Sequence, residues 1–379
     1  MLSLRSEEEQ MPLDFQSAEQ KFREDRIREL GQTPDGLLYL KLRSLSRKRY
    51  LERLFDRVGL TSRSTLARQM FREVYEAKVD MGTVNDLIRE IYEEERAVRR
   101  ETEDELVNEL YRLQVFDWGG LHQSGLERTI VNNYVKRTRR YDELCEKIDN
   151  ELQVSLRGYV LCSWYNHWTS IIIEDVFRDH PSVLPAVGQV KKIDFFISEV
   201  PFDLKVTYLP EGYIAERRRA QGLRPEITLL KGLAREFEVR YDRNMPQTRL
   251  LEDLWVKLAD HPSQQVTCRL RELKNTRDRV LEESILDPST LIRWLYEQQG
   301  TRRFDAANRL FLILVDKSNH FDSWKLKRAK PLLVDRIHVY LDEVGTNPGR
   351  DIELQWRDGQ VYNVVSDAIF VVHDRHPRP

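Results

Sequence analysis

The chain has 379 residues, of which 40% are hydrophobic and 33% are charged, a composition that is typical of a folded globular protein and excludes a disordered or fibrous one. Its 61 Lys and Arg residues nearly cancel its 63 Asp and Glu residues, so the net charge of -2 favours neither nucleic acid nor membrane, and a polyanion site has to come from local clusters. The three cysteines are scattered, the longest apolar run is too short to span a bilayer, and the N-terminus has no signal-peptide core. These features predict a cytoplasmic protein with no disulfide framework, Cys-based zinc site or membrane partner.

Residues 15 to 140 are expected to be helical almost throughout. Good helix formers recur with apolar residues at three-to-four spacing, and Pro and Gly are sparse. Gly59 separates two apolar stripes, and Ser62 or Ser64 is a candidate N-cap for the second helix. This outline fits a helix-turn-helix that reads DNA through the polar residues of its second helix. A plain helical hairpin explains the same residues.

The turn-rich stretch FDWGGLHQSG, residues 116 to 125, is expected to end this helical region. We therefore predict two domains. The first, residues 1–128, would be an N-terminal helical domain that serves in DNA recognition or partner binding. The second, residues 129–379, would carry the chemistry.

The second domain is expected to mix helices with strands. A long helix through LRGYVLCSWYNHWTSIIIEDVF ends before two prolines. The apolar period then changes to 2 and predicts two strands, near 190–197 and 201–208. Further along the chain we expect helices over 225–300, a buried strand at RLFLILVD, a helix that Pro331 bends, a hairpin turning at Asp358 and Gly359, and a last strand at AIFVV.

The stretch KKIDFFISEVPFDLKVT, residues 191 to 207, places charged residues among strand-forming ones. A hairpin that turns at Ser198 and Glu199 sets Asp194 opposite Asp203, with their Cβ atoms about 4.5–5.5 Å apart. Lys205 returns to the same face because side chains alternate along a strand. Two carboxylates this close repel each other, and a divalent cation that takes oxygen ligands relieves the repulsion. The alternative is a surface hairpin whose polar face is partly paired as a salt bridge.

This arrangement resembles the PD-(D/E)xK motif of the restriction-endonuclease-like nuclease superfamily. The motif here is KKID, eight intervening residues and DLK, and Glu174 on the preceding helix resembles the helix glutamate of many members. The resemblance covers residues 150 to 210, with a looser fit to the end of the chain. Ile193 stands where the motif has proline.

The resemblance implies an α+β or α/β fold, in which helices flank a central mixed sheet. It further implies hydrolysis of phosphodiester bonds with Mg²⁺, for which Mn²⁺ can substitute. Asp194, Asp203, Glu174 and the backbone carbonyl of Leu204 would bind the metal, and Lys205 would orient water and stabilise charge. By the same resemblance, the setting is prokaryotic restriction or antiphage defence, and the protein forms a homodimer or binds a defence-system partner.

Other residues are candidates for contact with DNA, with RNA as an alternative. His167 lies on the same face of its helix as Glu174 and is expected to contact phosphate, or to be an ordinary surface histidine. Two basic clusters could neutralise phosphates or simply be solvated. They are Arg217, Arg218, Arg219 and Arg224 in one segment and Lys136, Arg137, Arg139 and Arg140 in the other.

No Gly-rich phosphate loop, nucleophile elbow or HExxH motif is present in the sequence. The sequence therefore predicts a Mg²⁺-dependent DNA endonuclease. The alternative is a non-catalytic nucleic-acid-binding or assembly subunit that retains the nuclease fold.

Overall fold

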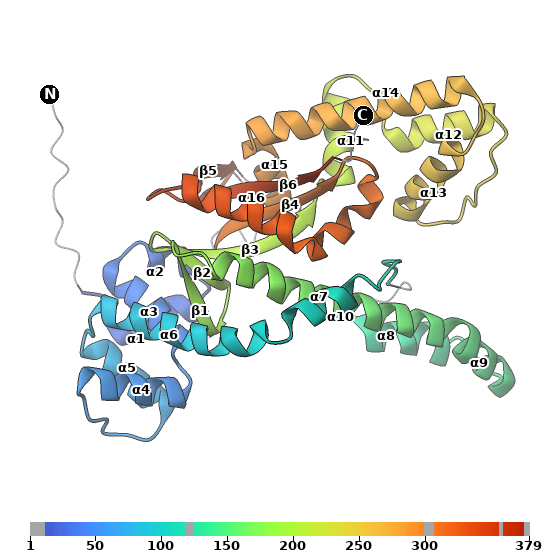
Figure 1. The fold of residues 1–379 in the computed structure, drawn as a ribbon. Coiled ribbons are helices and arrows are strands. Elements are labelled where there is room, and N and C mark those ends of the chain that lie inside the picture. Colours follow the sequence, from blue (N-terminus) through green and yellow to red (C-terminus); the bar gives the residue numbers. More distant parts are fainter. Residues whose placement is uncertain (1–11, 119–124, 299–306, 356–358, 375–379) are drawn as a thin grey trace, which may run out of the picture.

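The computed structural model describes residues 12–118, 125–298, 307–355 and 359–374 (Figure 1). Six strands form one mixed sheet in the order β1-β2-β3-β4-β6-β5. The strands are β1 (Val183–Val190), β2 (Ile193–Ile197), β3 (Val200–Tyr208), β4 (Asn308–Asp316), β5 (Arg350–Gln355) and β6 (Val361–His373). β3, β4 and β6 run parallel, and the other neighbouring pairs are antiparallel. The predicted class, a mixed sheet with flanking helices, is confirmed.

The first part of the chain is helical, as predicted, and none of its described residues belongs to a strand. Its helices are α1 (Phe15–Arg23), α2 (Ile27–Gly31), α3 (Pro34–Ser44), α4 (Lys48–Val58), α5 (Ala67–Glu76), α6 (Met81–Arg100) and α7 (Glu103–Leu110). Gly59 ends α4 in the left-handed conformation that glycine adopts without strain.

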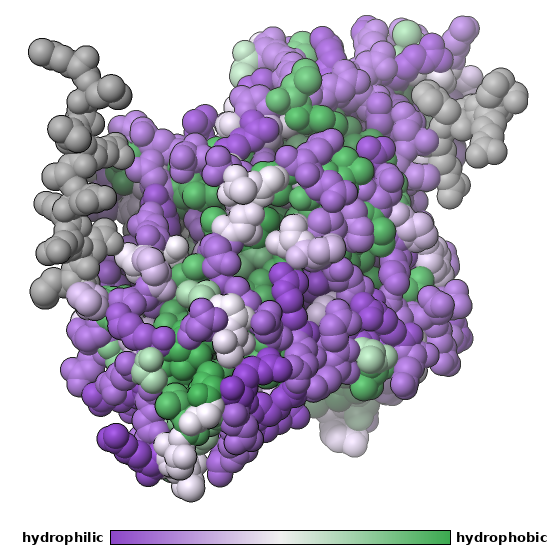
Figure 2. Space-filling view, turned by 60° about the vertical axis from the view of Figure 1, so that its left-hand side comes forward, coloured by the Kyte–Doolittle hydropathy of each residue, from purple (hydrophilic) through white to green (hydrophobic). Residues whose placement is uncertain are grey.

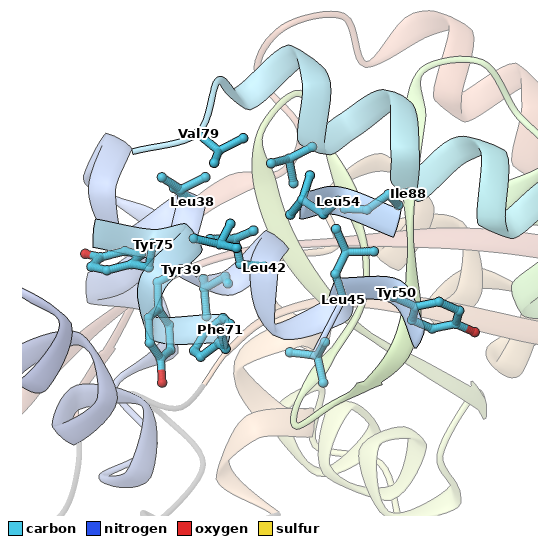
Figure 3. Packing of buried hydrophobic residues seen from close by; sticks show 14 of the residues in the cluster. Leu38, Tyr39, Leu42, Leu45, Tyr50, Leu54, Phe71, Tyr75, Val79 and Ile88 are labelled. Atoms are coloured by element: carbon cyan, nitrogen blue, oxygen red, sulfur yellow. The ribbon is translucent and has the colours of Figure 1, made fainter. Parts of the chain in front are cut away.

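One apolar cluster joins these helices to the first two strands. Its helical part includes Tyr39, Leu42 and Leu54 (Figure 3), and its sheet part includes Leu184 and Phe196. α3 approaches β1 so closely that a Cβ on Gly188 would lie 2.4 Å from the carbonyl oxygen of Ser44. The cluster therefore crosses the boundary predicted near residue 128, which itself stays a prediction. Hydrophilic residues cover most of the outer face at this side of the molecule (Figure 2).

The two faces of the sheet carry separate cores. On one face, α10 (Gln153–Arg178) and α16 (Lys330–Glu343) pack on side chains such as Phe202 and Leu310. On the other face, residues such as Phe311 meet α11, α14 and α15. The helices between β3 and β4 are α11 (Glu211–Ala220), α12 (Glu226–Glu236), α13 (Gln247–Ala259), α14 (Gln264–Leu286) and α15 (Ser289–Glu297), and α12 to α14 share an apolar cluster of their own.

A helical hairpin extends away from the sheet (Figure 1). We call residues 126–161 the projecting hairpin. It consists of α8 (Leu126–Ile130), the π-helical turn η2 (Val131–Val135), α9 (Tyr141–Lys147), the π-helical turn η3 (Ile148–Leu152) and the first nine residues of α10. The rest of α10 returns to the core.

Four local predictions were wrong. Strand β1 was not expected because Pro185 interrupts its pattern, but β1 lies at the edge of the sheet, where proline is tolerated. Neither Ser62 nor Ser64 caps α5, whose N-cap is Leu66. Pro331 starts α16 after the 3₁₀ segment η5 (His320–Arg328) instead of bending a longer helix, because proline suits the first turn. The last two predicted strand segments form the single strand β6.

The expected hairpin near the end of the chain is present as β5 and β6, where Gln355 pairs with Val361. Asp358 of its predicted turn lies outside the described residues. Within the part of the chain that the structure describes, no helix has the length and apolar composition needed to cross a membrane.

Candidate active site at the β2–β3 hairpin

The β2–β3 hairpin has the predicted register. Phe195 pairs with Phe202 and Ile197 pairs with Val200. Ser198 and Glu199, the turn residues, both have positive φ angles, of 46° and 69°, which is the backbone of a two-residue type I′ turn. The turn is tied to the N-terminal helices because Glu199 forms an ion pair with the buried Lys41 of α3.

Asp203 lies in the middle of a row of charges that crosses two parallel strands. The residue is 7% exposed. One oxygen is 2.6 Å from Nζ of Lys205, and the other is 3.3 Å from Nε of Arg309, the residue opposite Asp203 on β4. A buried carboxylate requires such partners, since an unpaired charge in the interior is strongly unfavourable.

Asp194 reaches across from β2 to the backbone of β3. Its Oδ2 accepts a hydrogen bond of 2.7 Å from the backbone N–H of Leu204, the residue between Asp203 and Lys205. Burial raises the pKa of Asp194; the bond from Leu204 opposes this rise in pKa, and the charge of Asp203 adds to it. Asp194 and Asp203 therefore act on each other electrostatically, as the predicted register requires.

Glu174 enters the same corner from the last two turns of α10. Burial raises its pKa; Arg178 opposes the rise in pKa and Asp194 increases it. Arg178, one turn later, is 2.8 Å from Glu174 and also donates to the backbone carbonyl of Asp194 at 3.1 Å. The neighbouring Asp175 points elsewhere and pairs with Arg99 of α6 at 2.7 Å, so Glu174 is the carboxylate that α10 contributes.

The charges of this corner are balanced. Three carboxylates, Glu174, Asp194 and Asp203, are matched by three cations, which are Arg178, Lys205 and Arg309. Among the described residues, no group of three His, Cys, Asp or Glu side chains is placed to hold a metal ion together. Carboxylates suit a hard cation such as Mg²⁺, but two of these three are held by ion pairs that a metal would have to displace.

Among the described residues, no hydrogen bond or ion pair joins the other predicted contact residues to this corner, and Arg218 is buried. His167 is exposed on α10, and Arg219 and Arg224 are exposed on and after α11. Arg217 pairs with Glu283 at 2.8 Å, and Arg218 is buried and donates to the carbonyl of Arg224 at 2.9 Å. Lys136, Arg137, Arg139 and Arg140 are exposed at the tip of the projecting hairpin.

Two members of the corner were missed in the sequence, Arg178 and Arg309. Each had a signal. Arg178 follows Glu174 by four residues, the spacing at which a helix pairs opposite charges. Arg309 is a charged residue directly before the apolar run Leu310–Val315 of a buried strand, and a buried cation on a central strand requires an acidic partner.

A cavity of about 760 Å³ lies further along β3, where Thr207 and Tyr208 reach its wall. Its lining includes aromatic residues such as Phe116 and Trp324, together with Arg249 and His320. It also includes five acidic residues, Asp117, Glu211, Glu252, Asp253 and Asp322. This excess of carboxylates does not suit the backbone of a nucleic acid, so we do not include the cavity in the candidate site.

A scan against protein-family models and searches of curated proteins and of solved structures found no match to this chain. The resemblance to the nuclease motif therefore rests on the residues of the hairpin and of α10.

Proposed function

We propose that this protein is a metal-dependent endonuclease that hydrolyses phosphodiester bonds in DNA. One observation carries the proposal. Asp203 lies 2.6 Å from Lys205, and Arg178 contacts both Glu174 at 2.8 Å and the backbone carbonyl of Asp194 at 3.1 Å, so the carboxylates of the hairpin and of α10 gather at one corner of the sheet. Carboxylates from separate elements can hold a metal ion that assists hydrolysis of a phosphodiester, and a neighbouring lysine can stabilise the charge that develops.

Once the ion pairs of Glu174 and Asp203 open and the side chains reorient, Glu174, Asp194 and Asp203 would hold the Mg²⁺ ion, with the carbonyl of Leu204 as a further candidate ligand. Bound there, Mg²⁺ would supply Lewis acidity toward phosphoryl oxygens and lower the pKa of water. The bond from the Leu204 N–H fixes the direction in which Asp194 points. The contact between Arg178 and the Asp194 carbonyl fixes β2 against α10. The carboxylates are therefore presented by rigid elements.

Lys205 has two states in this proposal. Without substrate its ammonium group neutralises Asp203, as the 2.6 Å contact indicates. When a phosphodiester enters, the ammonium would turn to the phosphoryl oxygens, stabilise the charge that develops on them and orient the attacking water. Arg219 and Arg224, both exposed, are the candidates for contacts with neighbouring phosphates.

The second candidate function is a non-catalytic nucleic-acid-binding or assembly subunit. The balanced charges favour it, because a corner with three carboxylates and three cations is stable without a metal. In that case the same residues would only hold β2, β3, β4 and α10 together.

Plasmid DNA incubated with the purified protein and Mg²⁺ or Mn²⁺ tests the first candidate. We expect nicking or linearisation by the wild type and a loss of on the order of 100-fold or more with Asp203→Asn and with Lys205→Ala. Lys257→Ala is the matched control, because the pair of Lys257 with Asp253 has a similar distance of 2.8 Å and a similar exposure. Single-stranded DNA and RNA in parallel reactions define the substrate.

Cleavage by all variants alike would place the activity elsewhere. Absence of cleavage by the wild type, with intact binding of DNA in a mobility-shift assay, would support the second candidate.

Mn²⁺ binding gives an independent test of the charge balance. Lys205→Ala removes the cation that competes for Asp203, so we expect this variant to bind Mn²⁺ more tightly than the wild type although it is inactive. Titration calorimetry with Mn²⁺ measures the difference. Equal or weaker binding by Lys205→Ala would mean that Asp203 is not a metal ligand.

A further inference from the structure

A second cavity lies among the N-terminal helices, and none of its lining residues belongs to the β2–β3 corner. Its volume is about 410 Å³. Its charged and phenolic lining residues are Glu19 and Arg23 of α1, Tyr39 and Arg43 of α3, and Arg68 of α5. Residues four apart on a helix lie on the same face, so α1 and α3 each turn one polar stripe toward this space. We call it the arginine cavity.

The lining of the arginine cavity is positively charged. Glu19 pairs with Arg23 at 3.1 Å and with Arg68 at 2.8 Å, so two cations share one carboxylate. The third cation, Arg43, forms no ion pair within the part of the chain that the structure describes. Three positive charges and one negative charge leave two positive charges in excess. A ligand with two negative charges would balance them.

Aromatic rings hold Arg43 in place without satisfying its donors. The guanidinium carbon of Arg43 lies 4.9 Å from the ring centroid of Phe22 and 5.5 Å from that of Phe71. Such contacts stabilise a cation. The Nε atom of Arg43 is nevertheless buried and has no hydrogen-bond partner among the described residues. A buried donor without an acceptor is unfavourable, so the position of Arg43 calls for an acceptor from outside the chain.

Two other arginines that lie over aromatic rings show the more usual arrangement. Arg49 lies 4.6 Å from the ring centroid of Tyr50 and pairs with Glu95 at 3.3 Å. Arg277 is buried over an aromatic ring and pairs with Glu226 at 2.6 Å. The chain thus supplies a carboxylate to these stacked arginines but not to the one in the cavity.

Tyr39 supplies a second donor without a partner. The residue is 1% exposed, and its hydroxyl oxygen points away from the rest of the apolar cluster (Figure 3). Burial raises the pKa of Tyr39 to about 12, and the charge of Arg43 opposes this rise, so the hydroxyl keeps its proton at neutral pH. No described residue accepts a hydrogen bond from it. A buried tyrosine hydroxyl normally has a partner.

We propose that the arginine cavity binds a small phosphate monoester, whose phosphate accepts hydrogen bonds from Arg43 and Tyr39. A phosphate monoester carries close to two negative charges at neutral pH, which matches the two positive charges in excess. A guanidinium group fits two phosphate oxygens at once. A carboxylate or a phosphodiester carries one negative charge and would leave part of the excess unbalanced.

The size and walls of the cavity indicate what the phosphate is attached to. A volume of about 410 Å³ lies within the range of pockets for small molecules and exceeds what a phosphate group needs. Phe22 and Phe71 also line the cavity, and aromatic walls suit a planar base. A nucleoside monophosphate therefore fits both parts, whereas inorganic phosphate would use the donors alone. Neither ligand requires the hairpin corner, so the proposal is independent of nuclease activity.

Isothermal titration calorimetry of the full chain with adenosine monophosphate tests the proposal. We expect the wild type to bind it, Arg43→Gln to weaken binding on the order of 100-fold and Tyr39→Phe on the order of 10-fold, because hydrogen bonds to a charged group are lost. Arg49→Gln is the matched control and should bind like the wild type. Arg49 also lies over an aromatic ring but does not line the cavity.

Glu19→Gln gives a readout that a purely structural role would not produce. This variant removes the carboxylate that competes for Arg23 and Arg68, so adenosine monophosphate should bind several-fold more tightly. Adenosine, which lacks the phosphate, should not bind. Inorganic phosphate distinguishes the two sources of the group: weaker binding than that of the nucleotide would assign the site to a nucleotide, and equal binding would assign it to free phosphate.

No binding of either phosphate compound at millimolar concentration would overturn the proposal, as would adenosine that binds as tightly as the nucleotide. Unchanged binding by both Arg43→Gln and Tyr39→Phe would also overturn it. Tyr39→Phe removes only a hydroxyl without a described partner, so it should stay folded even if Arg43→Gln does not, and circular dichroism checks both. Asp203→Asn should bind the nucleotide like the wild type, so failure of the nuclease proposal would not be mistaken for failure of this one.

Discussion

The two ends of helix α10 show how differently one continuous helix can be used. Its first nine residues belong to the projecting hairpin and contain no buried side chain. Its last turns bury Ile173 and Phe177 against the sheet, present Glu174 to the β2–β3 hairpin and tie Asp175 to α6. Composition does not distinguish the two ends, since both mix apolar and charged residues. The two ends differ in what surrounds them, which is solvent at the first and the sheet at the last.

Asp175→Ala, at the buried end of α10, should have the largest effect on the free energy of unfolding. Asp175 is 2% exposed and pairs with Arg99, so its removal leaves a cation without its partner and should lower the free energy of unfolding by about 3–5 kcal/mol. Asp149→Ala, in the exposed turn η3 that leads into α10, should change the free energy by less than about 0.5 kcal/mol. Urea unfolding followed by circular dichroism measures both. Equal effects would mean that the α6–α10 contact is not a stabilising one.

Ile173→Ala should have the next largest effect. Ile173 is fully buried, and its truncation should cost about 2–5 kcal/mol because a cavity remains. Val154→Ala should cost little in dilute solution. Urea unfolding of both variants measures the two costs, and equal costs would contradict the difference in burial between Ile173 and Val154.

The smallest effect concerns pH. Burial raises the pKa of Glu174, so the folded chain binds this proton more tightly than the unfolded chain does. The ionised group therefore destabilises the fold once the pH rises above the pKa of the unfolded state, about 4.3. The difference in free energy of unfolding between Glu174→Gln and the wild type should therefore favour the variant more at pH 7 than at pH 4. The opposite trend in urea unfolding would show that pairing with Arg178 outweighs burial.

The sequence was sufficient for the parts that depend on local patterns. The register of the β2–β3 hairpin follows from alternation and a two-residue turn, and the pairs of Phe195 and Ile197 confirm it. The direction of Glu174 follows from its place on the helix. Strand β1 was missed because Pro185 is unfavourable in a strand unless that strand lies at an edge, and edge position is a property of the whole sheet.

The parts that depend on contacts between distant segments could not be predicted. Arg309 reaches Asp203 from a strand about a hundred residues later. Its place beside an apolar run indicates that it needs an acidic partner, but nothing in the sequence indicates that this partner is Asp203. The docking of α3 on β1 at Gly188 is equally non-local. The sequence indicated the carboxylates and Lys205, but not that three cations neutralise the three carboxylates. This balance is apparent only when Arg178 and Arg309 are also located at the corner.

The long helical segment between β3 and β4 affects the order in which the chain folds. Phe202 pairs with Asn308 in a parallel ladder, and the described residues between them form five helices. Closing so large a loop is entropically unfavourable, and parallel pairing across it comes late in folding. The N-terminal helices and the β2–β3 hairpin are local and should form first. We therefore expect refolding in at least two kinetic phases, with Asp203 meeting Arg309 only in the slower one.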